Sequence, residues 1–129
     1  MIKQKYNELK FNDALLESIQ KDIFLFNLLP MIKIEDLKNI NIFLIEDIIS
    51  RLSLKLTSIV KNNNSNRIYL EIILSFFHLV VSSKIKLKTV TKLNLEDSLN
   101  YIKNDYKSFR ITNNELKLIE NIIKSIKKL

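Results

Sequence analysis

The chain contains no cysteine, no glycine and no tryptophan among its 129 residues, and it has a single proline. Without cysteine it can form no disulfide and offers no thiolate to a metal or a substrate. Without glycine it lacks the phosphate-cradling loop of nucleotide-binding proteins and the dinucleotide fingerprint, because both need a backbone approach that a Cβ atom blocks. The nucleophile elbow of hydrolases and the tight turns of hairpins also depend on glycine, which argues against such a catalytic site and against an all-β fold.

Histidine is nearly absent as well, since His78 is the only one. A multi-histidine metal site is therefore impossible within one chain. His78 lies between Phe77 and Leu79, and the sequence offers no neighbouring group that would tune it as a catalytic base. We interpret it as a core or boundary histidine that bonds to a backbone or hydroxyl group.

Carboxylates occur as three adjacent pairs, at Glu35-Asp36, Glu46-Asp47 and Glu96-Asp97. Neighbouring side chains on a helix point about 100° apart, so no pair can aim both carboxylates at one metal ion or one bond. Interaction with helix dipoles and with water explains the pairs more simply. We therefore expect no metal, no cofactor and no enzymatic activity.

The residues that are present have the balance of a globular protein, with 47% hydrophobic and 27% charged. A chain of this length suits one domain with one core, so residues 1–129 are expected to form a single helical domain. No signal-peptide pattern opens the sequence, and the longest apolar run, Ile23 to Ile32, is too short to span a bilayer. These features predict a cytoplasmic protein without a membrane segment.

Apolar residues recur at three- and four-residue spacing along most of the chain, which predicts an all-α fold. The expected helices of the first two thirds are 2–10, 13–29, a short turn at 35–39, 42–61 and 67–81. Asp47 and Arg51 are spaced for an ion pair on the fourth of these, and asparagines at 62–66 end it. The segment 67–81 is apolar on nearly every side, so we expect a bundle of five to six helices around it; a buried strand over part of it is the alternative.

Residues 83–93 are expected to form an extended, lysine-rich connector. Lys84, Lys86 and Lys88 alternate with apolar residues at period two, and threonines follow, so an edge strand is possible there. We expect Asn94 to cap the next helix, whose first turn holds acidic residues. Thr112 and Glu115 have the spacing of a capping box, which predicts a last helix over 113–128.

Positive charge is concentrated in the connector rather than spread evenly along the chain. The net charge is +7, but residues 1–79 hold ten basic and nine acidic side chains, and residues 94–129 hold seven and five. Residues 80–93 hold four lysines and no acid. The scarcity of glycine, alanine and arginine is typical of an AT-rich genome, so the total charge by itself is weak support for nucleic-acid binding; its position along the chain is more informative.

Aromatic and basic residues also interleave shortly after the connector, between Tyr101 and Arg110. Lysines that neutralise phosphates, together with aromatic rings on which bases stack, are the ingredients of single-strand binding. The alternative interpretation is that Tyr106 and Phe109 pack in the core while the lysines are merely solvated. The candidate nucleic-acid-binding residues are Lys84, Lys86, Lys88, Lys92, Tyr101, Lys103, Lys107 and Arg110.

Two functions remain open. The first is a non-enzymatic accessory subunit that contacts a nucleic-acid backbone within a larger nucleoprotein complex. In size, helical content and lysine-rich surface the chain resembles the small helical subunits of CRISPR effector complexes, and more loosely the helical C-terminal domains of bacterial clamp-loader subunits; no motif carries either resemblance. The second is a protein-interaction module (an adaptor, inhibitor or immunity-type protein) that binds an acidic partner or self-associates through exposed apolar residues such as Phe11, Phe24, Phe43 and Leu54.

Overall fold

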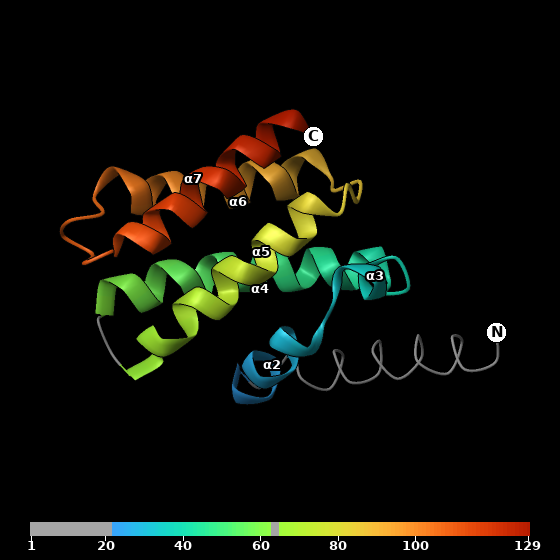
Figure 1. The fold of residues 1–129 in the computed structure, drawn as a ribbon, viewed down its shortest axis with the longest axis horizontal. Coiled ribbons are helices and arrows are strands. Elements are labelled where there is room, and N and C mark those ends of the chain that lie inside the picture. The colour runs from blue at the N-terminus through green and yellow to red at the C-terminus, as the bar shows by residue number, and fades with distance from the viewer. Residues whose placement is uncertain (1–21, 63–64) are drawn as a thin grey trace.

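The computed structural model describes residues 22–62 and 65–129, and within these ranges it contains helices and no strand. The all-α prediction is thus confirmed. The helix expected at 2–10 and most of the one expected at 13–29 lie outside the described residues. In chain order the elements (Figure 1) are α2 (Asp22–Leu28), the 3-10 segment η1 (Leu29–Met31), α3 (Ile34–Leu37), α4 (Ile42–Asn62), the 3-10 segment η2 (Ser65–Tyr69), α5 (Leu70–Ser82), α6 (Thr89–Asn104) and α7 (Asn113–Lys128).

The four long helices form a ring of neighbours. α4 packs along α6, α6 along α7, α7 along α5, and α5 closes the ring against α4. The short elements α3 and η1 pack on α5 at the side of this ring (Figure 1). Nearly all buried apolar side chains, from Leu25 to Ile126, form one continuous cluster inside this arrangement. No helix of the described part is both long and apolar enough to cross a membrane.

Helix α4 matches its predicted stripe. Ile45, Ile48 and Ile49 are among its fully buried side chains. On the opposite face Arg51 Nε donates to Asp47 Oδ2 at 3.3 Å, which confirms the predicted pair at i and i+4. The helix runs to Asn62, one residue beyond the predicted end.

Helix α5 has the central position expected of the most apolar segment, because it packs against α3, α4, α7, η1 and η2. Two details differ from the prediction. Residues 65–69 form a 3-10 segment, so the α-helix begins at Leu70 rather than near Arg67. One side of α5 also reaches the surface, where Ile72 and Leu79 are only half-buried.

The extended connector is shorter than predicted. Only 85–88 lie outside a helix or turn, and α6 already begins at Thr89, so the expectation of extended structure to residue 93 and of a cap at Asn94 is wrong. Helix α6 starts early because a carboxylate from α4 accepts from the backbone N–H of its N-cap residue, Lys88, and from the Thr91 hydroxyl in its first turn, both more than 40 positions away in sequence. β-branched residues such as Val90 and Thr91 oppose helix formation only weakly, so this tertiary contact decides the boundary.

The start of α7 follows the predicted capping box. Thr112 Oγ1 accepts from the Glu115 backbone N–H at 3.1 Å, and Glu115 Oε1 accepts from the Thr112 N–H at 2.8 Å. Two of the donors that a helix start leaves unpaired are thereby satisfied by local sequence. The buried face of α7, which includes Ile119, Ile122 and Ile126, is the predicted one.

Candidate nucleic-acid interface

The turn that leads into the connector has an unusual backbone conformation at Lys84. Lys84 has a φ of 62°, in the left-handed region that usually favours glycine or asparagine after a helix. The turn before it is closed by Ser83, whose N–H donates to Leu79 O and Val80 O and whose hydroxyl donates to Val80 O at 2.6 Å. A chain without glycine must place a residue with a Cβ atom here, at a cost of about 1 kcal/mol.

Beyond this turn the predicted period-two alternation is present. Leu87 is buried and Ile85 half-buried against the core, so Lys86 and Lys88 are directed to solvent. Anchoring of the apolar residues thus determines which way the lysines project.

The far end of the connector is fixed by Glu46 of α4. Its Oε2 accepts from the Lys88 N–H at 2.6 Å and from the Thr91 hydroxyl at 3.2 Å, although the residue is only 8% exposed. Lys88 is the N-cap residue of α6, so a buried anion sits at the positive end of that helix dipole. These two bonds compensate for removing the carboxylate from water.

Four lysines from three elements meet in one pocket of about 420 Å³ between the end of α5, the connector and the last turn of α7. Lys84 and Lys86 come from the turn and connector, Lys92 from the first turns of α6 and Lys128 from α7. None of the described residues that line it is acidic. We call this site the basic pocket; its remaining described lining residues are Val81, Ser82, Ile85, Leu87, Ser125 and Leu129.

Lysines and hydroxyls in this arrangement suit an anion with several oxygens. A lysine carries three donors on a flexible stem and binds phosphate as a point charge. The apolar lining supports the lysine stems while their charged ends stay accessible. Lys128 was not among the candidates from sequence, because its closeness to Lys92 depends on how α7 packs along α6.

The remaining candidates do not join the basic pocket. Lys88 is exposed, and its Nζ lies 5.4 Å from the centre of the Phe43 ring. Tyr101 is nine residues beyond Lys92, which on a helix is about half a turn round the axis and about 14 Å along it. The Tyr101 ring is 5.4 Å from both the Phe109 ring and Lys61 Nζ. These contacts place Tyr101 on the side of α6 nearer α4.

The last three candidates lie at the C-terminal end of α6 and in the loop after it. Lys103 is in the final turn of the helix, while Lys107 and Arg110 are exposed in the loop. Tyr106 and Phe109 pack against the core as partly buried side chains, as the alternative interpretation of this stretch proposed. The eight candidates therefore divide into two separate groups at opposite ends of α6.

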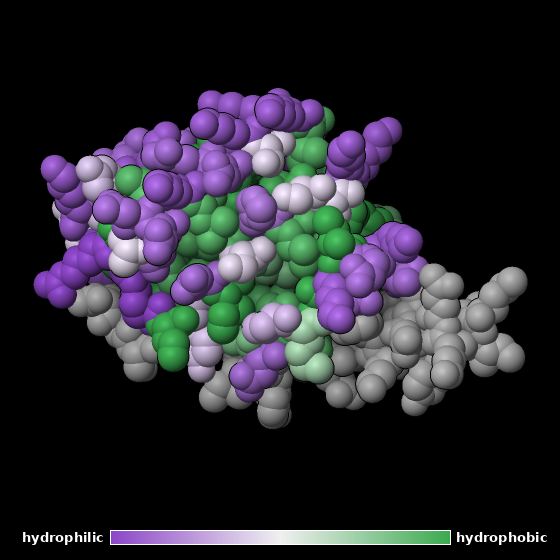
Figure 2. Space-filling model, viewed as in Figure 1, coloured by the Kyte–Doolittle hydropathy of each residue, from purple (hydrophilic) through white to green (hydrophobic). Residues whose placement is uncertain are grey.

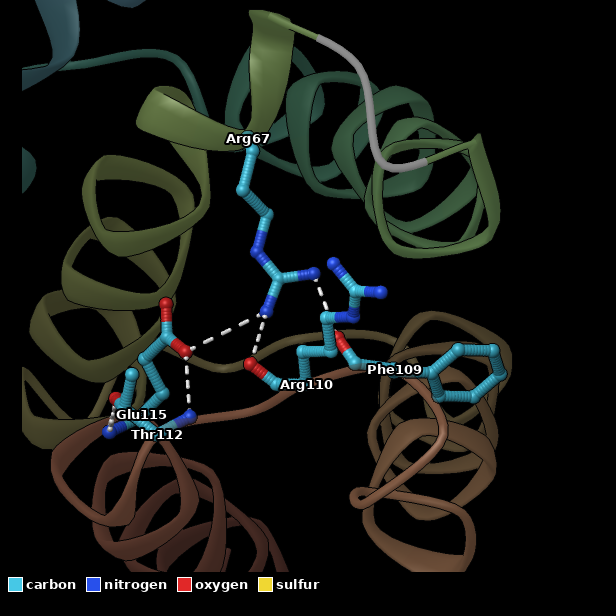
Figure 3. Close-up of polar contacts among 5 residues, drawn as sticks. All are labelled: Arg67, Phe109, Arg110, Thr112 and Glu115. Carbon is cyan, nitrogen blue, oxygen red and sulfur yellow. Dashed lines mark hydrogen bonds and ion pairs between the residues drawn. The ribbon is translucent and has the colours of Figure 1, made fainter.

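The loop between α6 and α7 is fastened by Arg67, which the sequence did not single out. Its Nη1 donates to Phe109 O and its Nη2 to Arg110 O, both at 2.7 Å, and Nη2 lies 3.7 Å from Glu115 Oε1 (Figure 3). Arg110 has a φ of 56°, the second left-handed residue among those described. The fork of one guanidinium thus holds two adjacent carbonyls of this loop.

The described residues do not gather metal-ligating side chains at one place. They contain no group of three or more histidine, cysteine and acidic side chains that could hold a metal ion. The acids of the Glu46-Asp47 pair turn to different partners, as expected for neighbours on a helix. Asp36, from another pair, accepts from the Lys33 N–H at 2.9 Å at the start of α3.

No protein-family model, no curated protein and no solved structure matches the chain.

Substitution by glycine separates the backbone conformation of Lys84 from the charge of its side chain. Lys84→Gly is expected to raise the free energy of unfolding by about 1 kcal/mol, because glycine adopts a left-handed φ without the Cβ penalty. Urea denaturation followed by circular dichroism measures the change. Lys86→Gly, two residues on in extended backbone, is the matched control and is expected to be neutral or destabilising. Equal effects of the two variants would contradict the assignment.

Proposed function

We propose that this chain is a non-enzymatic accessory subunit that binds the phosphate backbone of a nucleic acid through the basic pocket. The observation that supports this is the convergence of Lys84, Lys86, Lys92 and Lys128 without an acidic residue in the described lining. Four lysines around one pocket repel one another, which opposes folding. A bound anion would offset this repulsion, so the arrangement favours an anion-binding site.

The pocket suits a polymer backbone better than a base-reading role. Its described lining contains no aromatic residue and no asparagine or glutamine, the side chains that stack on bases or pair with their edges. Lysines and serine hydroxyls bind phosphate and sugar without reading sequence. We therefore expect weak sequence preference and strong dependence on salt.

The salt dependence can be stated quantitatively. If all four lysines neutralise phosphates of a single strand, the logarithm of the association constant falls against the logarithm of salt concentration with a slope of about −3. Fluorescence anisotropy with a labelled oligonucleotide, single-stranded or duplex, measures this slope. Absent or salt-insensitive binding at low salt would overturn the proposal.

A double substitution locates the contact. Lys86→Ala with Lys92→Ala is expected to weaken binding about tenfold and to reduce the slope by about 1.4, because two phosphate contacts are removed. Lys117→Ala with Lys124→Ala is the matched control: it removes the same charge from exposed positions of α7 that do not line the pocket. Equal losses in the two doubles would show that only total charge matters.

The other candidate group is tested by Tyr101→Ala. We expect this variant to leave binding unchanged, since its ring lies about half a turn of α6 away from Lys92. A large loss would move the contact to the Tyr101–Arg110 end instead.

A protein-interaction module is the second candidate function. It is supported by the exposure of Phe43 and Leu54, which are 66% and 76% exposed on α4. Of the other two residues named for this role, Phe11 lies outside the described residues and the Phe24 side chain is not described. A pull-down with Phe43→Ser and Leu54→Ser as negative variants tests it.

A further inference from the structure

The outward side of α5 is the least charged helix surface of the described chain. Glu71 is the one charged residue in the 13 residues of this helix, whereas the outward side of α4 carries Asp47, Arg51 and Lys61. Ile68, in η2 directly before α5, is 73% exposed. Figure 2 shows hydrophobic side chains reaching the surface along the course of α5, bordered by hydrophilic ones.

The residues on this side have the spacing of a helix-packing seam. Ile68, Ile72, Ser75 and Leu79 follow one another at intervals of four, three and four. On an α-helix this alternation aligns Ile72, Ser75 and Leu79 along one line, as in coiled coils. Ile68 precedes the helix, in η2, and lines the same groove. Ile68 and Ser75 are exposed, and Ile72 and Leu79 are half-buried, so the described elements cover this line of residues only in part. We call these four residues the α5 seam.

A groove runs beside the α5 seam. It has a volume of about 440 Å³. The wall opposite α5 is formed by Leu29, Pro30 and Ile32, in and directly after η1. All four seam residues line it on the α5 side. A helix laid along the seam can therefore place apolar side chains in this groove.

We propose that the α5 seam binds the α5 seam of a second copy of this chain, with the two helices antiparallel. Matching the seams about a two-fold axis pairs Ile68 with Leu79 of the second copy and Ile72 with Ser75 of the second copy. The large residues meet at the two ends and each central layer combines a large residue with a small one. The serines thus let the two helices approach closely.

Hydrogen-bonding complementarity between the Glu71 carboxylate and the His78 ring favours this occupant and this direction. Glu71 and His78 are seven residues apart, so they lie on the same flank of the seam. In antiparallel pairs the same flanks face each other, which brings Glu71 of each copy beside His78 of the other. A parallel pair would instead put both carboxylates at the same end of the seam. Because the chain has a net charge of +7, association is also least opposed at a surface without lysine or arginine.

The oligomeric state tests the proposal. Light scattering after size exclusion, over a concentration series, is expected to show a mass rising to twice the 15.2 kDa of one chain. Ser75→Arg is expected to weaken association tenfold or more, because a long side chain replaces the small one opposite Ile72 of the second copy and keeps the two helices apart. Asn94→Arg adds the same charge on the exposed side of α6 and should not change the mass. A monomeric wild-type chain, or equal behaviour of both variants, would overturn the proposal.

Charge exchange tests the register. Glu71→Lys and His78→Glu should each weaken self-association. In the first variant the introduced lysine of each chain faces His78 of the other, and in the second the introduced glutamate of each chain faces Glu71 of the other. Mixing the two variants should restore dimers, because the lysine introduced at position 71 of one chain then faces the glutamate introduced at position 78 of the other, and the native Glu71 and His78 still face each other. Each variant is first checked for native helicity by circular dichroism, and if His78→Glu does not fold, the Ser75→Arg comparison still decides. Failure of the folded mixture to associate would overturn the antiparallel register.

Discussion

Replacement of Glu46 by alanine is expected to lower the free energy of unfolding by about 3 kcal/mol. The carboxylate is almost fully buried and accepts from the Lys88 N–H and the Thr91 hydroxyl. Alanine would leave both donors without this partner at the start of α6 and would remove an anion from the positive end of its dipole. Thermal and urea denaturation measure the loss.

The residue next to it provides the control. Asp47→Ala removes the same kind of charge one position along α4, but its pair with Arg51 is about half-exposed on both sides. Such pairs contribute only about 0.3–0.5 kcal/mol. Glu46→Gln, which keeps one oxygen acceptor, is expected to fall between the two. If Glu46→Ala and Asp47→Ala proved equally mild, the carboxylate would not be what holds the start of α6.

Loss of Glu46 is also expected to affect the basic pocket. The connector carries Lys84 and Lys86 between two fixed points, the left-handed turn at Lys84 and the capped helix start at Lys88. Loss of the Glu46 bond to the Lys88 N–H would let the side chains of Lys84 and Lys86 move apart. Nucleic-acid affinity of Glu46→Ala, measured where the variant is still folded, should therefore fall although no positive charge has been removed.

Replacement of Arg67 by alanine is expected to destabilise the fold by about 3 kcal/mol. Two carbonyls, of Phe109 and Arg110, would each lose a charge-assisted hydrogen bond of 2.7 Å, and Glu115 would lose a nearby cation. The effect should be concentrated in the loop that these carbonyls belong to. Hydrogen exchange is expected to show faster opening at the start of α7, together with a lower unfolding midpoint.

Arg67→Lys and Arg51→Ala sharpen this prediction. Lysine keeps the charge but lacks the planar fork that reaches two adjacent carbonyls, so we expect it to recover less than half of the lost stability. Arg51→Ala removes an arginine from an exposed pair and should cost no more than about 0.5 kcal/mol. Full recovery by lysine would show that charge, and not the forked geometry, is what the loop requires.

Much of the fold was predictable because its causes are local. The apolar stripes of α4 and α7 and the Thr112–Glu115 capping box depend on residues within a few positions of each other, and the structure confirms them. The candidate site was predicted only in part. Lys84, Lys86 and Lys92 are close in sequence and meet in the basic pocket, while Lys88 and Tyr101 turn away from it.

The errors share one physical origin. Local propensity predicts an N-cap at Asn94, whereas the observed N-cap is Lys88, six residues earlier, where a carboxylate from α4 accepts from the backbone N–H. Arg67 was passed over because its partners are 42 and 43 positions away. Nothing in the sequence near Lys128 indicates that it lines the same pocket as Lys92.

The helical spacing of apolar residues, with the absence of glycine, was enough to predict an all-α fold. The positions of the lysines alone showed that most of the excess positive charge lies in one short segment. Only the tertiary structure decided how long the extended part of that segment is, which of its lysines share a pocket, and which side of α5 the described elements leave partly exposed. Helical periodicity is a property of neighbouring residues, whereas caps, pockets and exposed faces depend on which helices pack together.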